Sequence, residues 1–117
     1  MKVLRITFKM TLFAVSTPAA WLVITCGLPF VRMTGGSIPR WRARIFHHWA
    51  RIIAWGLGMH VTVEGEPPPS PFLLVANHLS YVDIVLLVSQ VPCTFVARAD
   101  LRDWPLFGPM VPAGGTL

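Results

Sequence analysis

The stretch Leu74-Val75-Ala76-Asn77-His78-Leu79-Ser80-Tyr81-Val82-Asp83-Ile84 decides how the second half of the chain folds. The apolar run 72–76 is typical of a strand covered on both faces. Ser80 and Asp83 have the spacing of a capping box, which predicts a short helix that starts at Ser80 and continues over 83–90. His78 would then lie on the turn between strand and helix, with Asp83 in the first helical turn.

His78 and Asp83 are candidates for acid–base chemistry. A carboxylate on one ring nitrogen fixes the tautomer and stabilises the imidazolium. The other nitrogen can then take a proton from a bound hydroxyl group. The spacing alone is weak, since His78 as a turn residue and Asp83 as a helix cap would also account for it.

A second predicted strand, 94–97, ends one residue before Arg98. The stretch between the two strands is too long for a hairpin and long enough for a helical crossover, which predicts a parallel βαβ unit. His78 and Arg98 would meet at the carboxyl edge of that sheet, where ligands bind. Arg98 could equally be an exposed surface residue. Upstream, 61–63 is predicted as a short strand, followed by the proline-rich connection 66–71.

The first part of the chain contains an uncharged run of 22 residues, Met10–Val31. As a helix it would extend roughly 33 Å, enough to cross a bilayer. Pro18 and Pro29 interrupt the run and basic residues flank both ends, so a re-entrant or shallow insertion with both ends on the cytoplasmic face stays open beside a full span. A cleaved signal peptide is a third alternative, with a poor cleavage site after Pro18.

The segment 40–59 has the pattern of an amphipathic helix. One face would carry Trp41, Ile45, Phe46, Trp49, Ile52 and Ile53, and the other Arg40, Arg44, His47 and Arg51. Such a helix can lie in the headgroup zone of a membrane or pack on a protein core. His47 and His48 are expected to be solvated or interfacial. Cys26 and Cys93 show no spacing typical of a metal site or a disulfide framework.

Composition supports contact with a membrane. The 117 residues are 54% hydrophobic and 13% charged, about half the charged share of an ordinary soluble domain. Eight basic residues and no acidic ones precede Glu64, whereas two basic and five acidic residues are found from Glu64 onward. Because the basic residues sit among long apolar runs, a membrane is a better partner for them than nucleic acid.

The quoted stretch closely resembles the first motif, N-H-x-S-x-x-D, of the glycerolipid (1-acyl-sn-glycerol-3-phosphate) acyltransferases. The stretch Phe95–Leu101, followed by Pro105 and Gly108, resembles the family's second region. The resemblance implies an α/β fold, with membrane-associated helices over 1–59 and the N-terminal part of an acyltransferase domain over 60–117. It also implies that His78 is the general base, that Asp83 orients it, and that Arg98, Asn77, Ser80 and Gly108 bind substrate.

The implied reaction moves a fatty acyl group from acyl-CoA or acyl carrier protein to 1-acylglycerol-3-phosphate, forming phosphatidic acid at the cytoplasmic face of the inner membrane. No cofactor or metal is expected, and neither Ser80 nor Cys93 is a strong candidate nucleophile. A lyso-aminolipid acceptor and a non-catalytic membrane-bound module are the alternatives; a hydrolase would need a nucleophile that the sequence does not place. The family's later arginine-bearing and E-G-T-type motifs do not occur in the chain, so we expect an N-terminal fragment that is inactive alone.

Overall fold

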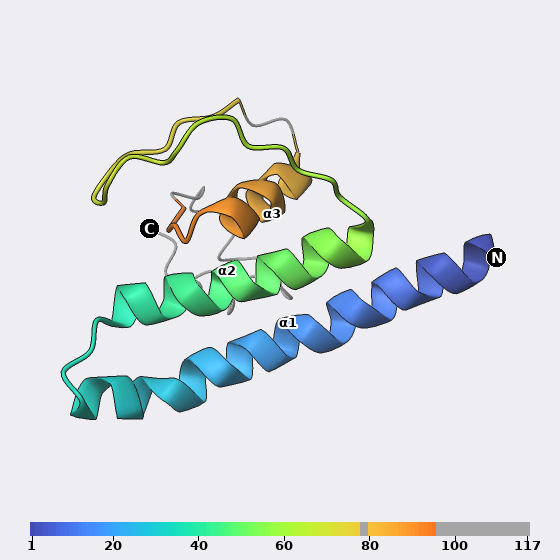
Figure 1. Ribbon diagram of the computed structural model, residues 1–117. Helices are drawn as coiled ribbons and strands as arrows, with labels where there is room; N and C mark the ends of the chain where they lie inside the picture. Colours follow the sequence, from blue (N-terminus) through green and yellow to red (C-terminus); the bar gives the residue numbers. More distant parts are fainter. Residues whose placement is uncertain (78–79, 96–117) are drawn as a thin grey trace.

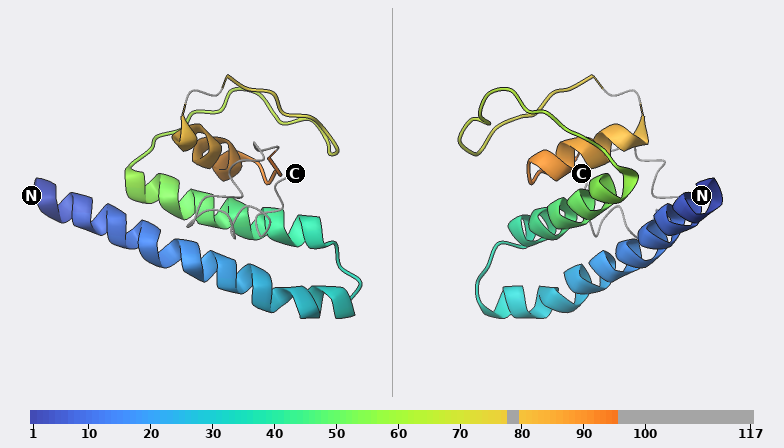
Figure 2. Two further views of the ribbon diagram at one scale, coloured as in Figure 1. Left: turned by 180° about the vertical axis from the view of Figure 1, so that it is seen from behind. Right: turned by 45° about the vertical axis from the view of Figure 1, so that its right-hand side comes forward.

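The computed structural model describes residues 1–77 and 80–95, which form three helices. They are α1 (Lys2–Met33), α2 (Ile38–Leu57) and α3 (Tyr81–Gln90). α1 and α2 lie side by side and run in opposite directions, and α3 packs on α2 (Figure 1). The two further views in Figure 2 show the same order, with α2 between α1 and α3. α2 therefore connects the long apolar helix to the helix that carries Asp83.

α1 is one continuous helix that includes both Pro18 and Pro29. The expectation that these prolines interrupt the apolar segment is therefore wrong, although a proline inside a helix costs about 3 kcal/mol. The packing of α1 along α2 offsets part of the cost of the two prolines. Much of the helix surface is exposed: nine apolar side chains of α1 are more than half exposed, namely Val3, Leu4, Ile6, Phe8, Met10, Val15, Leu22, Phe30 and Met33. By length and composition α1 could cross a membrane, a test that a signal sequence also passes.

α2 confirms the amphipathic helix predicted over 40–59. Ser37 is its N-cap in extended conformation, and Pro39 lies in the first turn, where proline is tolerated. The helix ends at Gly58, whose φ of 74° is the left-handed conformation that favours glycine. There the amide of Gly58 donates to the carbonyl oxygen of Trp55, and that of Met59 to Ala54, each at 2.9 Å. These bonds satisfy the last carbonyl groups of the helix and turn the chain away from α1.

Three side-chain hydrogen bonds hold α1 and α2 together along their length. Lys9 Nζ donates to the carbonyl oxygen of Leu57 at 3.1 Å, near the N-terminus of α1. Trp49 Nε1 donates to Thr17 Oγ1 at 3.2 Å in the middle. Trp41 Nε1 donates to the carbonyl oxygen of Ile24 at 3.4 Å, near the start of α2. The two helices therefore form one antiparallel hairpin.

Two glycines permit the close approach of these helices. A Cβ atom placed on Gly27 would lie 2.4 Å from the ring of Trp41, and one on Gly56 would lie 2.0 Å from Leu12 Cδ2. Both distances are too short for carbon atoms in contact. The Trp41 ring is rigid and hydrogen-bonded, whereas the end of the Leu12 side chain can rotate, so Gly27 is the stricter requirement of the two.

The predicted strands 61–63 and 72–76 do not form, which corrects the prediction of secondary structure in this segment. Residues 58–77 instead run outward past α3 and double back as two irregular arms lying alongside each other (Figure 1). Leu73 and Val75 are 86% and 81% exposed, so the apolar run lacks the cover on both faces that was expected of it. An apolar run becomes a strand only where a neighbour supplies hydrogen bonds, and its predicted neighbour 94–97 lies partly outside the described residues. The helical first region is thus present, and the α/β sheet is not shown in the part of the chain described.

Candidate active site

Ser80 and Asp83 form the N-terminal end of α3 as the capping box that their spacing predicts. The backbone amide of Ser80 donates to Asp83 Oδ2 at 2.8 Å, and the amide of Asp83 donates to the carbonyl oxygen of Ser80 at 3.1 Å. A carboxylate in this position also interacts favourably with the positive end of the helix dipole. These bonds hold the Asp83 carboxylate in the first turn of α3, three residues after Ser80.

The other predicted site residues are only partly within the described structure. Asn77 lies exposed at the end of the irregular arm that leads to α3. His78, Arg98 and Gly108 lie outside the described residues, so their assigned roles and the predicted approach of His78 to Asp83 stay predictions. Within the described residues, the structure brings together Ser80 and Asp83 and no group of three metal-ligating side chains.

Cys93, which follows the C-terminal end of α3, is poorly suited to covalent catalysis. The side chain is partly buried, and burial raises the pKa of the Cys93 thiol. Because the thiolate is the nucleophilic form, a raised pKa leaves less of it at neutral pH. The sequence likewise did not indicate Cys93 as a strong candidate nucleophile.

His47 has a structural contact that its place on the polar face of α2 does not reveal. Instead of being solvated, it is partly buried, and its Nδ1 lies 2.6 Å from the carbonyl oxygen of Val88 in α3. Val88 is fully buried, as is Ala50 one turn along α2. No sequence pattern could indicate this bond, because it depends on how α3 docks against α2.

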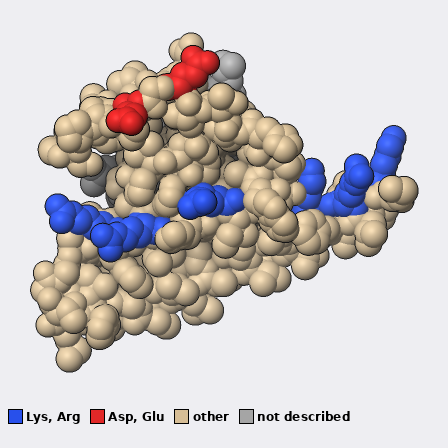
Figure 3. Space-filling view, in the orientation of Figure 1, with Lys and Arg blue, Asp and Glu red and all other residues tan. Residues whose placement is uncertain are grey.

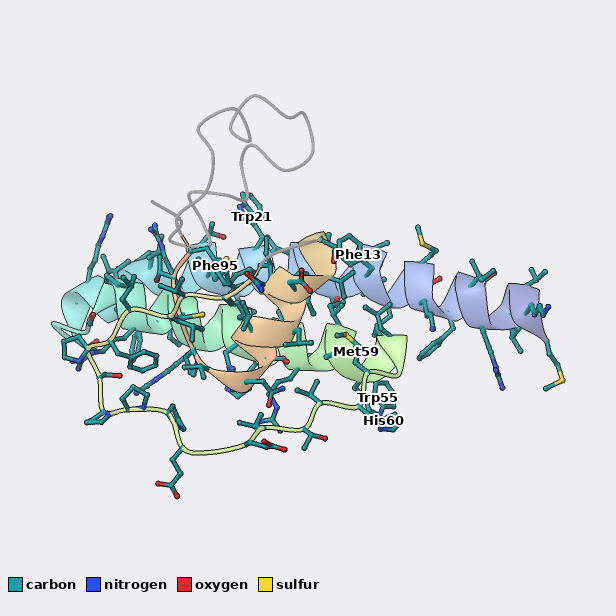
Figure 4. All side chains as sticks on the ribbon, turned by 90° about the horizontal axis from the view of Figure 1, so that it is seen from above. Phe13, Trp21, Trp55, Met59, His60 and Phe95 are labelled. Atoms are coloured by element: carbon teal, nitrogen blue, oxygen red, sulfur yellow. The ribbon has the colours of Figure 1, made fainter. Side chains whose placement is uncertain are left out.

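Beside this contact, a pocket of about 440 Å³ lies between α2, α3 and the chain that leaves α2. Its lining residues are His47, Arg51, Ala54, Trp55, Met59, Val61, Ser89 and Gln90. Figure 4 shows Trp55 and Met59 close together at the C-terminal end of α2, next to His60. The pocket therefore combines polar groups from two helices with apolar side chains.

Comparison with known proteins gives this site a chemical context. Residues 60–117 match the family model described as Acyltransferase. The chain is 38% identical over 99 residues to a lyso-ornithine lipid O-acyltransferase of Pseudomonas aeruginosa, an alignment that covers 85% of this chain and 36% of the relative. A lyso-ornithine lipid O-acyltransferase of Rhizobium meliloti is 44% identical over 70 residues, 59% of this chain and 23% of the relative. No solved structure gives a significant match.

Another relative is named for a different acceptor. The 1-acyl-sn-glycerol-3-phosphate acyltransferase of Neisseria meningitidis is 29% identical over 89 residues, 74% of this chain and 35% of the relative. The motif residues and these matches together show that the chain belongs to the glycerolipid acyltransferase family. It spans about a third or less of the length of these relatives.

Proposed function

We propose that the protein carrying this sequence is a lysolipid O-acyltransferase. The support is the N-H-x-S-x-x-D motif within a matched acyltransferase region, together with the capping box that holds Asp83 at the N-terminus of α3. In this mechanism His78 removes the proton from the acceptor hydroxyl as its oxygen attacks the carbonyl carbon of the acyl thioester. The C–S bond then breaks, and the thiol of the donor leaves with the proton that His78 gives up.

Asp83 orients His78 in this mechanism and stabilises the imidazolium formed during the transfer. Its Oδ2 already accepts the Ser80 amide, which limits rotation of the carboxylate. The acyl group passes directly from acyl-CoA or acyl carrier protein to the acceptor, with no covalent enzyme intermediate. Arg98, Asn77, Ser80 and Gly108 are assigned to substrate binding, and Arg98 contacts the anionic group of the acceptor.

A lyso-ornithine lipid is the favoured acceptor, because four relatives with that activity in their names are 34–44% identical to this chain. 1-Acylglycerol-3-phosphate is the second candidate, supported by the relative from Neisseria. Both acceptors have a hydroxyl to acylate and an anionic group, carboxylate or phosphate, that an arginine can bind. The reaction at His78 is the same for both.

Acyl transfer by the protein at its full natural length tests the proposal and separates the acceptors. With radiolabelled acyl donor, the rates with lyso-ornithine lipid and 1-acylglycerol-3-phosphate are compared for the unchanged protein, His78→Ala and Arg98→Ala. We expect faster acylation of lyso-ornithine lipid, a loss of about 10²–10⁴-fold in His78→Ala, and a raised KM for the acceptor but not the donor in Arg98→Ala. Full activity of His78→Ala would overturn the mechanism. Residues 1–117 alone are expected to transfer little.

We also propose that the α1–α2 hairpin lies parallel to the membrane surface in the cytoplasmic leaflet of the inner membrane. α2 accompanies α1 from Lys9 to Ile24, so an upright α1 would carry α2 with it. Arg40, Arg44 and Arg51, exposed on one face of α2 and here called the cationic stripe, would then enter the hydrocarbon layer. Each arginine at the bilayer centre costs about 2.5–3.5 kcal/mol or more.

The distribution of charge supports the parallel orientation. Figure 3 shows basic side chains in a row along the molecule, with the uncharged surface of α1 on one side and the acidic residues on the other. If α1 lies in the acyl region, this row falls at the level of the lipid headgroups, where arginine and tryptophan are favoured. The uncovered apolar side chains of α1 then face lipid instead of water.

Labelling of single cysteines distinguishes the orientations. Lys2→Cys, Ser37→Cys and Glu66→Cys are each made in a Cys26→Ser, Cys93→Ser background and exposed to a membrane-impermeant maleimide in sealed inside-out vesicles. We expect all three to be labelled from the cytoplasmic side. A protected Ser37→Cys would show an upright hairpin, and a protected Lys2→Cys would show that α1 alone crosses; either result contradicts the parallel orientation. Release of the protein by high salt would contradict insertion altogether.

A further inference from the structure

The pocket between α2 and α3 has no role in the mechanism above. It lies at the C-terminal end of α3, whereas Asp83 lies at the N-terminal end. Asp83 and the pocket residue Gln90 are seven residues apart in α3, about 10 Å along the helix axis. The pocket and the Asp83 carboxylate therefore lie toward opposite ends of α3.

The polar side of the pocket is basic and rich in hydrogen-bond donors. Arg51 contributes a guanidinium, is exposed, and forms no ion pair with the acidic residues in the described parts of the chain. Gln90 is exposed and contributes an amide, of which one N–H is donated to Ser89 Oγ at 2.9 Å. His47 Nδ1 is hydrogen-bonded to the carbonyl oxygen of Val88. This bond also reduces the negative potential that the helix dipole places at the C-terminal end of α3.

The lining of the pocket also includes apolar side chains. Ala54, Met59 and Val61 line it beside the exposed ring of Trp55. The volume of about 440 Å³ is within the usual range for small-ligand sites, roughly 300–1,000 Å³. A lining that combines a guanidinium with apolar side chains suits a molecule that joins an anionic group to a hydrocarbon chain.

We infer that this pocket binds the phosphate group of a bilayer phospholipid, as an accessory site distinct from the acyl-transfer site. Arg51 donates to the phosphate oxygens, Gln90 supplies a second donor, and Trp55 and Met59 contact the glycerol backbone and the first acyl carbons. Arg51 belongs to both the cationic stripe and the pocket, so a hairpin parallel to the membrane brings lipid phosphates to it directly. The bound lipid would hold α2 and α3 at a set depth in the headgroup layer.

A soluble short-chain lipid tests the site without the non-specific attraction of basic residues to the surface of a lipid vesicle. Binding of dihexanoyl-phosphatidylglycerol to the full-length protein in detergent is measured by calorimetry, beside dihexanoylglycerol, which lacks the phosphate, and inorganic phosphate, which lacks the chains. We expect the phospholipid to bind at least about tenfold more tightly than either. Arg51→Gln should weaken phospholipid binding to the level of dihexanoylglycerol.

Arg44→Gln is the matched control. It removes the same charge from the same exposed stripe but does not line the pocket. Its affinity for the phospholipid should stay close to that of the unchanged protein, and both variants should keep their helix content by circular dichroism. Equal weakening in the two variants, or none in Arg51→Gln, would overturn the site. Inorganic phosphate that binds as tightly as the phospholipid, in an Arg51-dependent way, would overturn the lipid as its occupant. Because the readout is binding, failure here is separate from failure of the acyl-transfer proposal.

Discussion

Nδ1 of His47 lies 2.6 Å from the carbonyl oxygen of Val88 and joins the helix hairpin to the helix that carries Asp83. A carbonyl oxygen can only accept, so the ring nitrogen carries the hydrogen and donates it. Val88 is fully buried, which leaves its carbonyl group with no access to a replacement in bulk water. This bond therefore couples the position of α3 to that of α2.

Replacing His47 should loosen α3. His47→Ala leaves the buried carbonyl of Val88 without its donor, a loss of about 1–3 kcal/mol. Hydrogen exchange followed by mass spectrometry should show faster exchange over residues 81–90 with little change in α1. His48→Ala is the control, since His48 is the exposed neighbour of His47. Equal effects of the two substitutions would show that the His47 bond does not hold α3.

The glycines of the hairpin should differ in their tolerance of a methyl group. Gly27→Ala forces the ring of Trp41 to move and strains its bond to Ile24, whereas Gly56→Ala requires only that the end of Leu12 rotates. We expect Gly27→Ala to lower the free energy of unfolding by about 1–3 kcal/mol and Gly56→Ala to have a smaller effect. Thermal unfolding in detergent measures both. A larger loss in Gly56→Ala would contradict the close packing of Gly27 and Trp41.

The two roles assigned to Asp83 can be separated by substitution. Asparagine keeps an oxygen that can accept the Ser80 amide, so Asp83→Asn should preserve α3, but the neutral side chain no longer stabilises an imidazolium. Asp83→Ala removes the cap as well and should cost about 0.5–2 kcal/mol of stability. Acyl-transfer rates and unfolding curves of the full-length variants provide the two measurements. An active Asp83→Asn enzyme would leave Asp83 with a capping role alone.

The alkylation of Cys93 should respond to pH as a thiol with a raised pKa. Burial favours the neutral form, so the folded chain should reach half of its maximal rate with iodoacetamide at a higher pH than the chain unfolded in urea. The variant Cys26→Ser isolates the signal, and mass spectrometry of the Cys93 peptide gives the rate. A midpoint at the same or a lower pH in the folded chain would show that burial does not govern this thiol.

Local patterns in the sequence determined the helices of this chain. The spacing of apolar residues predicted α2, and the Ser80–Asp83 pair predicted the start of α3, because a helix period and a capping box depend only on residues within one or two turns. The motif around His78 indicated the family for a similar reason, since its chemistry is contained in a few consecutive residues. These features need no knowledge of distant contacts.

Only the tertiary structure decided what the helices do together. Pro18 and Pro29 indicated a break in α1, but the helix continues where it packs along α2. Apolar runs predicted strands at 61–63 and 72–76, but strands require a partner to complete their hydrogen bonds, and none forms there in the described residues. The bond from His47 to Val88 and the pocket beside Arg51 likewise depend on α2 meeting α3. Each of these outcomes arises from residues far apart in the sequence, whose contacts a local pattern does not contain.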